Sequence, residues 1–274
     1  MDSSAQVIIA NLTSPPVLAF AIGLLAVLVK GDLRLPDPIY QGLSIYLLLG
    51  IGIKGGVALR ESDLSDVAIP ALATIILGLL IPVMAFLFSG KITKLSEIDR
   101  GALAAHYGST SLVTFTAALV FLEQSSIQYE GFVTTLLALL EIPGIIVGLM
   151  LGSRHLKRDV SWGESLQEIF SSRSILLLVG GLVLGFATGV VGYAKIEPFF
   201  GALFIGMLTL FLLEMGTLAG RRMRDVKSAG AGLIVFAILF PIASGFLGVV
   251  FGYLSGLSMG GAAVLGVLAA SASY

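Results

Sequence analysis

Residues 101–116 read GALAAHYGSTSLVTFT and decide the fold. The flanks of this stretch are apolar, but its centre is a glycine followed by three hydroxyl residues, Gly108-Ser109-Thr110-Ser111. Short hydroxyl side chains compete for backbone hydrogen bonds, so this centre makes a poor continuous helix. Inside a membrane, such a break is tolerated only where it is buried in protein or lines a cavity. The stretch therefore predicts a membrane helix that is broken at mid-depth.

The composition around this stretch is that of a membrane protein. Of the 274 residues, 57% are hydrophobic and 12% are charged, whereas soluble domains carry about 25% charged residues. The mean hydropathy is +1.01. The net charge of −1 excludes a general polyanion binder, so we expect no nucleic-acid partner. The chain has no cysteine, which excludes disulfides, thiolate metal sites and cysteine nucleophiles.

Sequence signatures of enzymes are missing. There is no Walker A lysine loop and no His-Glu-x-x-His motif. Two histidines without cysteine cannot build a usual transition-metal site. We therefore expect no enzymatic activity and no cofactor, and an ion gradient as the energy source.

The apolar segments between charge clusters predict nine membrane helices. A spanning helix needs about 20 mostly apolar residues, and charged residues mark the borders between spans. The predicted spans are residues 14–29, 38–53, 67–88, 101–122, 131–151, 174–194, 198–213, 229–251 and 259 to the end. The fold class is thus an all-α polytopic membrane protein, in contact with lipid along its length.

The distribution of basic residues predicts the orientation. If the N-terminus lies outside, only Lys54, Arg60 and Lys195 fall in outer loops, and the other 13 of the 16 basic residues fall inside. Membrane proteins carry their excess of Lys and Arg on the cytoplasmic side. We therefore expect a multi-pass protein of the cell (inner) membrane with its N-terminus outside.

The two halves of the chain resemble each other at an offset of about 160 residues. Short matching segments in the same order include residues 38–42 with 198–201, 80–83 with 239–242, and 108–111 with 270–273. Because the first copy holds five spans, an odd number, the second copy must enter the membrane upside down. Inverted repeats are typical of secondary transporters, whose substrate site lies at the repeat interface.

The repeat divides the chain into residues 1–152 as the first repeat, 153–173 as a cytoplasmic linker, and 174–274 as the second repeat. An irregular apolar stripe predicts that the linker lies along the membrane surface, with a docking surface for a regulator as the alternative. The first copy continues for about 40 residues past Ser111, whereas the second ends one residue after Ser273. We therefore expect ten spans in the intact protein, nine of them present here.

The break at Gly108–Ser111 is the candidate binding site. A half-helix N-terminus offers free N–H groups and a positive dipole, which suit a small anion. The hydroxyls of Ser109, Ser111 and Thr114 are hard oxygen ligands, which suit sodium. Their counterparts Ser271 and Ser273 in the second repeat predict that both repeats contribute. The alternative is that these small polar residues only hold helices together.

Four ionisable residues lie at membrane depth or near it. Glu141 interrupts the fifth span and is a candidate intramembrane acid, as a cation ligand, a proton carrier or a protonated group bonded to a kinked helix. His106 borders the break, and we favour an interior histidine with satisfied hydrogen bonds over a gate or pH sensor. Lys54 and Glu214 fall at the ends of spans two and seven, which favours interfacial snorkelling.

These motifs resemble the sodium-dependent bicarbonate transporter family, of which the cyanobacterial-type bicarbonate uptake permease is the best-known type. The resemblance rests on residues 108–111 leading into Thr114 and residues 117–119, on residues 122–130 (LEQSSIQYE), and on Glu141-Ile142-Pro143-Gly144. It extends in collinear order over essentially the whole chain.

The resemblance implies ten helices in two inverted repeats of five, a gate and a core domain with broken helices four and nine, and a homotrimer. It implies sodium-coupled uptake of a small anion, bicarbonate first, by alternating access of the elevator type, with a PII-like cytoplasmic regulator as a candidate partner. The substrate would contact Gly108, Ser109, Thr110, Ser111, Ser271 and Ser273. Sodium would contact Ser109, Ser111, Thr114 and Ser273, with no other metal.

The chain departs from the cyanobacterial pattern at two places. Leu112-Val113 stand where that pattern continues with Gly-Ser, and the loop between the repeats is short. Two alternatives therefore stay open. One is a sodium-coupled transporter of another small anion, such as a small carboxylate. The other is a transport-inactive membrane sensor or scaffold with the same fold.

Overall fold

The computed structural model describes residues 9, 12–31, 33–153, 167, 171–226 and 230–273. Regular structure within these ranges is entirely helical. The elements are α2 (Pro15–Leu28), α3 (Asp37–Glu61), α4 (Leu64–Ile92), α5 (Glu97–Gly108), α6 (Leu112–Gln124), α7 (Val133–Ser153), α9 (Arg173–Ala194), the π-helix η1 (Pro198–Ala202), α10 (Phe204–Val226), α11 (Gly230–Leu254) and α12 (Met259–Ala270). Most of the predicted linker, residues 154–166 and 168–170, lies outside the described residues, as does Tyr274.

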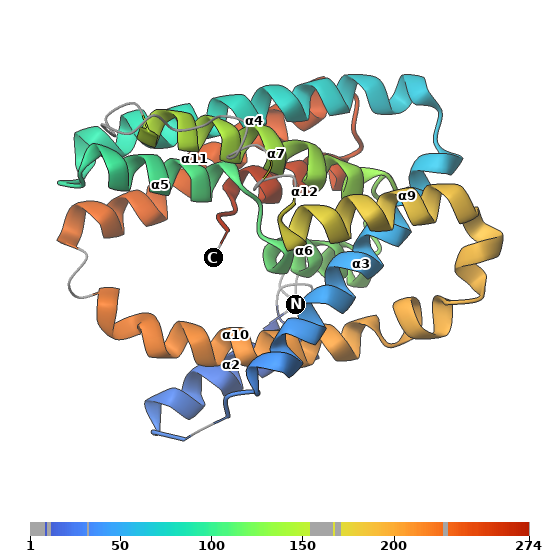
Figure 1. Cartoon of the computed structure of the whole chain (residues 1–274), viewed down its shortest axis with the longest axis horizontal. Helices are drawn as coiled ribbons and strands as arrows, with labels where there is room; N and C mark the ends of the chain where they lie inside the picture. Colours follow the sequence, from blue (N-terminus) through green and yellow to red (C-terminus); the bar gives the residue numbers. More distant parts are fainter. Residues whose placement is uncertain are drawn as a thin grey trace.

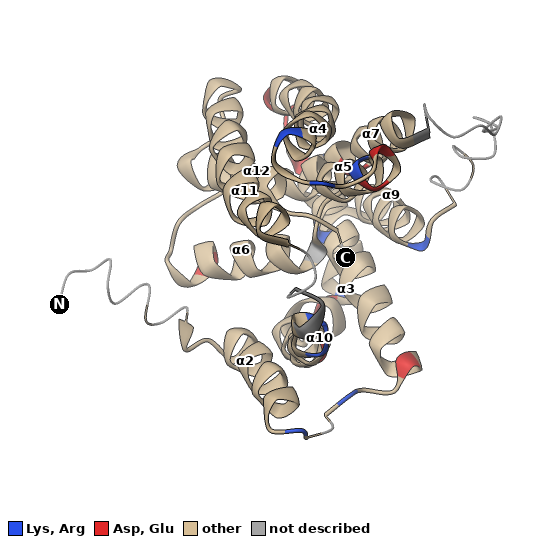
Figure 2. Cartoon of the chain, turned by 90° about the vertical axis from the view of Figure 1, so that its left-hand side faces the viewer, with Lys and Arg blue, Asp and Glu red and all other residues tan. Residues whose placement is uncertain are grey.

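Seven helical segments in the described part of the chain are long and apolar enough to cross a membrane. They are α3, α4, α5 with α6, α7, α9, η1 with α10, and α11. The two shorter apolar helices, α2 and α12, have 14 and 12 residues. Charged residues lie mostly near the helix ends (Figure 2). Seven of the nine predicted spans thus correspond to segments long enough to cross a membrane, and the first and ninth correspond to the shorter helices α2 and α12. The protein is a multi-pass α-helical membrane protein.

Some helices extend beyond the borders that charged residues predict. α3 runs on to Glu61, so Lys54 and Arg60 are helical residues and not residues of an outer loop. Arg60 can lie within the helix because its guanidinium finds hydrogen-bond acceptors on the neighbouring helix α9. Gly189 has a positive φ of 60° that bends α9, and the Arg60 guanidinium donates to the carbonyls of Phe186 (3.1 Å) and Ala187 (2.9 Å) before that bend.

The helices form two groups. In the first, α3 packs along α9 and α2 packs along α10. In the second, α4 packs on α5, α7 and α11, and α12 packs on α11 and α6. Figures 1 and 2 both place α4, α5, α7, α11 and α12 on one side of the molecule and α2 and α10 on the other. The groups meet mainly where α3 contacts α7.

Glycines allow very close contact between the helices of the first group. Four of the closest examples place a Cβ against a carbonyl oxygen of the partner helix: Gly56 with Leu182, Gly185 with Ile53, Gly216 with Phe20, and Gly23 with Leu213. The first two contacts join α3 to α9, and the last two join α10 to α2. Residues 56 and 216 are 160 positions apart, and residues 20 and 182 are 162 apart. The same contact therefore occurs twice with the two chain halves exchanged.

Candidate functional site

The helix is broken where the hydroxyl residues predict. α5 ends at Gly108, and Ser109 and Ser111 have extended backbone with ψ of 154° and 114°. Ser111 is the N-cap of α6, where its Oγ accepts from the Thr114 N–H at 3.4 Å. The Thr114 hydroxyl in turn donates to the Ser111 carbonyl at 3.0 Å. Serine favours an N-cap because its oxygen satisfies one of the free amides of the first turn.

The second half of the chain meets this break directly. α12 ends at Ala270, and the extended residues that follow lie against the break. The Ser111 N–H donates to Ser271 Oγ at 3.1 Å, across 160 positions of sequence. The Ser273 N–H donates to the His106 carbonyl at 2.9 Å. Backbone groups that the interrupted helix leaves free are thus bonded by residues of the other half.

The break is buried and holds an unsatisfied oxygen. Ser109, Thr110, Ser111 and Ser271 are each at most 6% exposed. Among the described residues, Thr110 Oγ1 has no hydrogen-bond partner. A buried hydroxyl left unpaired costs about 1–3 kcal/mol. Thr110 therefore carries a buried hydroxyl that no described residue satisfies, as Ser125 and Thr135 also do.

Glu141 lies beside the break. Its side chain is 8% exposed, and its Oε1 accepts from the Ser109 hydroxyl at 3.3 Å. Two glycines make this contact close, because a Cβ at either Gly108 or Gly144 would collide with the backbone of the other. α7 therefore packs on the end of α5 with its acidic side chain toward the hydroxyl cluster.

The remaining predicted residues differ in their burial and contacts. Ser273 is half-buried and Thr114 is exposed, each within a few residues of the buried cluster. His106 is exposed, so the expectation of an interior histidine is wrong, although its Nδ1 lies 3.1 Å from the Ser273 carbonyl oxygen. Glu214 is buried and accepts from the Leu35 N–H at 2.7 Å. A snorkelling role for Glu214 is therefore also wrong.

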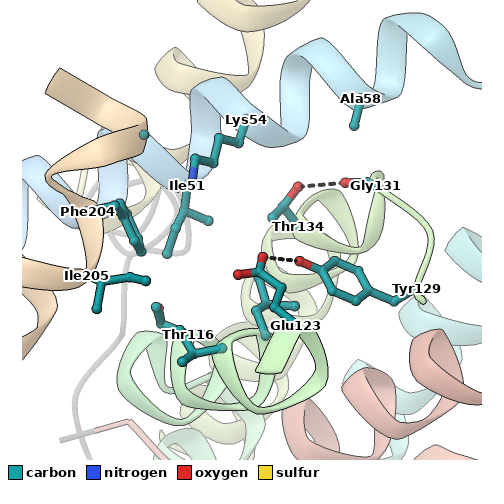
Figure 3. Close-up of a pocket in the computed structure, with 13 residues that line it drawn as sticks. Ile51, Lys54, Ala58, Thr116, Glu123, Tyr129, Gly131, Thr134, Phe204 and Ile205 are labelled. Carbon is teal, nitrogen blue, oxygen red and sulfur yellow. Dashed lines mark hydrogen bonds between the residues drawn. The ribbon is translucent and has the colours of Figure 1, made fainter. Parts of the chain in front are cut away.

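A cavity that the sequence does not predict lies between the two helix groups (Figure 3). It has a volume of about 260 Å³ and is lined by α3, α6, the start of α7 and the start of α10. Lys54 enters it from α3 with its Nζ 4.6 Å from the centre of the Phe204 ring. Snorkelling of Lys54 into an interface is thus wrong, because the ammonium faces a cavity inside the protein.

An acidic residue faces Lys54 across this cavity. Glu123 extends from α6, and its Oε1 accepts from the Tyr129 hydroxyl at 2.8 Å (Figure 3). Burial raises the pKa of Tyr129, and the hydrogen bond to Glu123 raises it further. The phenol therefore stays protonated and remains a donor. Thr116, Leu119 and Glu123 share one face of α6 at helical spacing. That spacing is the one sequence signal that could have pointed to the cavity.

A second cavity of about 400 Å³ lies at the other end of α3. It is lined by Tyr40, Glu214 and Leu218, together with Arg34, Asp37, Met215, Arg221 and Arg222. Lys54 and Ala58 line the first cavity, and Glu214 and Leu218, 160 positions later, line the second. The two cavities are therefore lined by equivalent positions of the two chain halves, as the glycine contacts are.

The described residues contain no group of three or more His, Cys, Asp or Glu that could hold a metal ion. The break instead gathers hydroxyls, peptide groups and one carboxyl.

A family model described as the Na+-dependent bicarbonate transporter superfamily matches residues 15–274, nearly the whole chain. The chain belongs to this superfamily. A comparison with curated proteins finds no match. Membership identifies a membrane transport protein and not an enzyme.

Proposed function

We propose that this protein couples inward movement of sodium to uptake of a small anion, with bicarbonate as the favoured substrate. The observation that carries the proposal is the buried break between α5 and α6, contacted by Ser271 of the other half and holding the unpaired hydroxyl of Thr110. Membership of a sodium-dependent bicarbonate transporter superfamily supports the same substrates.

The break offers groups for both an anion and sodium. For the anion, the N-terminal turn of α6 supplies a positive dipole end, and the candidate contacts are Gly108, Ser109, Thr110, Ser111, Ser271 and Ser273. For sodium, the candidate oxygen ligands are Ser109, Ser111, Thr114 and Ser273. Glu141, which accepts a hydrogen bond from Ser109, would compensate the sodium charge. A sodium ion and an anion bound next to each other would offset each other's charge in this buried position.

Two inverted repeats account for the exchanged contacts. The pairs Gly56–Leu182 and Gly216–Phe20 are related by offsets of 160 and 162 residues, as a two-fold axis in the membrane plane requires. The positive φ of Lys30 at the end of α2 and of Gly189 in α9 fit the same relation, 159 positions apart. Helical resemblance by composition alone would not reproduce specific contacts in this way.

The two helix groups are candidates for a gate and a core. α2, α3, α9 and α10 would form the gate, and α4 to α7 with α11 and α12 would form the core that holds the break. In an elevator mechanism, the core slides against the gate and carries the bound ions. The corresponding cavities at the two ends of α3 are then the openings toward the two sides.

The remaining proposals concern the setting of the molecule. The basic residues favour the inner membrane with the N-terminus outside, which puts the cavity of Lys54 on the outer side. A homotrimer and a PII-like cytoplasmic regulator stay predictions from the resemblance. Beyond sodium, neither a further metal nor a cofactor is proposed.

The proposal is tested by uptake of labelled bicarbonate into proteoliposomes, with and without an inward sodium gradient. Uptake that needs the gradient supports it. Uptake that is indifferent to sodium contradicts the coupling. Sodium-driven uptake of a small carboxylate but not of bicarbonate would establish the alternative substrate. No uptake of any small anion would favour a sensor or scaffold.

Ser111→Ala tests the position of the site. This change removes both a candidate ligand and the N-cap of α6, so we expect the half-saturating sodium concentration to rise at least about tenfold, equivalent to roughly 1.4 kcal/mol. Ser172→Ala is the matched control, because Ser172 caps α9 by accepting from the Ile175 N–H at 3.5 Å. Normal sodium dependence in the Ser111 variant would exclude this site.

A further inference from the structure

The cavity of Lys54 places two opposite charges on different helix groups. Lys54 belongs to α3, which pairs with α9, whereas Glu123 belongs to α6, which packs on α12. Both side chains extend into the same space, and Figure 3 shows them facing each other. No salt bridge joins them in the described structure. The space between ammonium and carboxylate is therefore open to a third group.

The cavity has the size and the wall of a site for a small polar ligand. Its volume of about 260 Å³ exceeds the roughly 30 Å³ that one water occupies in the liquid. Thr116 and Thr134 line it as buried residues, at 1% and 5% exposure. The Phe204 ring contacts the Lys54 ammonium at 4.6 Å and holds it within the cavity. The Lys54 ammonium is thus positioned to bind a ligand in the cavity.

The cavity also extends toward the helix break. Thr116, Leu119 and Glu123 lie along one face of α6, with Glu123 one residue from its end and Thr116 only five residues after Ser111. Five residues of α-helix span about 7.5 Å. An ion in the cavity is thus within two helical turns of the candidate binding site.

We propose that this cavity is an entry site for a monovalent oxyanion that carries one hydroxyl donor, with Lys54 binding its carboxylate end and Glu123 accepting from its hydroxyl. The inference rests on the proposed function and names the substrate class that the outer cavity selects. Bicarbonate fits this description, as do small hydroxy acids. Formate and nitrate lack the donor and leave Glu123 facing a negative ion.

The opposing charges explain why such an anion is preferred. Lysine alone would attract any anion, whereas the nearby carboxylate repels an anion that cannot donate a hydrogen bond to it. Tyr129 holds Glu123 by donating to one of its oxygens, Oε1, which leaves Oε2 for a ligand. A charge-assisted hydrogen bond contributes more than a neutral one, so both ends of the anion matter.

The test measures the KM for bicarbonate at saturating sodium in the proteoliposomes. Lys54→Gln should raise this KM about tenfold or more, while the half-saturating sodium concentration stays unchanged. Lys195→Gln is the control, because it removes the same charge from an exposed residue next to α9. Equal KM values in the Lys54 and Lys195 variants would overturn the entry site. Absence of sodium-driven uptake in the unmodified protein would instead overturn the proposed function.

A second variant keeps the inference testable if Lys54→Gln does not reach the membrane. Glu123→Gln leaves Lys54 in place and removes the carboxylate that faces it across the cavity, while Glu197, which also interacts electrostatically with Lys54, is retained. We expect formate and nitrate, at tenfold excess, to become inhibitors of bicarbonate uptake in this variant although they do not inhibit the unmodified protein. An inhibition profile identical to that of the unmodified protein would overturn the role of Glu123, and with it the proposed selectivity.

Discussion

At the scale of single residues, Thr110 gives the sharpest experiment. Its buried hydroxyl has no partner among the described residues, so Thr110→Val removes no hydrogen bond from the protein. The thermal stability without sodium should stay equal or rise, since an unpaired buried polar group is lost. If Thr110 contacts an ion, the stabilisation that sodium or bicarbonate adds should disappear. Thermal unfolding in detergent, with and without each ion, measures both effects.

Thr74→Val provides the contrast. Thr74 is fully buried and its hydroxyl donates to the Pro70 carbonyl at 2.7 Å. This variant should lose stability by about 0.5–1.5 kcal/mol and keep the full ion-dependent stabilisation. If Thr110→Val responds to ions as the unmodified protein does, Thr110 is not a ligand.

The sequence could predict the break but not the partners that hold it. A glycine and three adjacent hydroxyl residues within an apolar segment are a local signal, and the helix ends there. That Ser271 Oγ accepts from the Ser111 N–H depends on how α12 packs near α6. The prediction for Lys54 fails for a related reason. A hydropathy pattern assigns a charged residue to the end of a span, even where its side chain extends into a cavity within the protein.

At the scale of helices, the close contact between α3 and α9 depends on glycine. Gly185→Ala would place a Cβ against the Ile53 carbonyl, and such overpacking costs about 1–3 kcal/mol. Gly180→Ala on the same helix meets nothing within 4 Å, so it should be neutral or stabilising by up to about 1 kcal/mol. Thermal unfolding of both variants in one detergent measures the difference.

The repeat extends this prediction to a second interface. Gly23 of α2 stands against the Leu213 carbonyl as Gly185 stands against Ile53, so Gly23→Ala should be destabilising to a similar degree. A neutral Gly23→Ala beside a damaging Gly185→Ala would argue against equivalent packing of the two pairs. The sequence matches predicted an inverted repeat, but only atomic contacts reveal which residues exchange places.

At the scale of the whole molecule, the proposed sliding of core against gate requires that the two groups not be fixed together. A Cβ added at Gly131 would lie 2.7 Å from that of Ala58, so paired cysteines there can join the loop before α7 to α3 once the loop moves back by about 1 Å to the separation that a disulfide needs. Because these 274 residues contain no cysteine, no other thiol among them competes. Oxidation should abolish uptake, and reduction should restore it.

A cross-link within one group serves as the control. A Cβ at Gly252 would lie 3.1 Å from that of Ala262, and both residues belong to the α11–α12 pair. Cysteines at these positions should form a disulfide without loss of uptake. Undiminished uptake by protein fully cross-linked between residues 58 and 131 would contradict the sliding motion.

The bonds that join residues 106–111 to residues 271–273 also constrain how the protein is made. Ser111 is synthesised 160 residues before Ser271, an interval of about 8–32 s at about 5–20 residues per second. During that time the interrupted helix sits in the membrane with backbone groups that nothing in its own half satisfies. These bonds can therefore form only after residues 271–273, which follow α12, have been made.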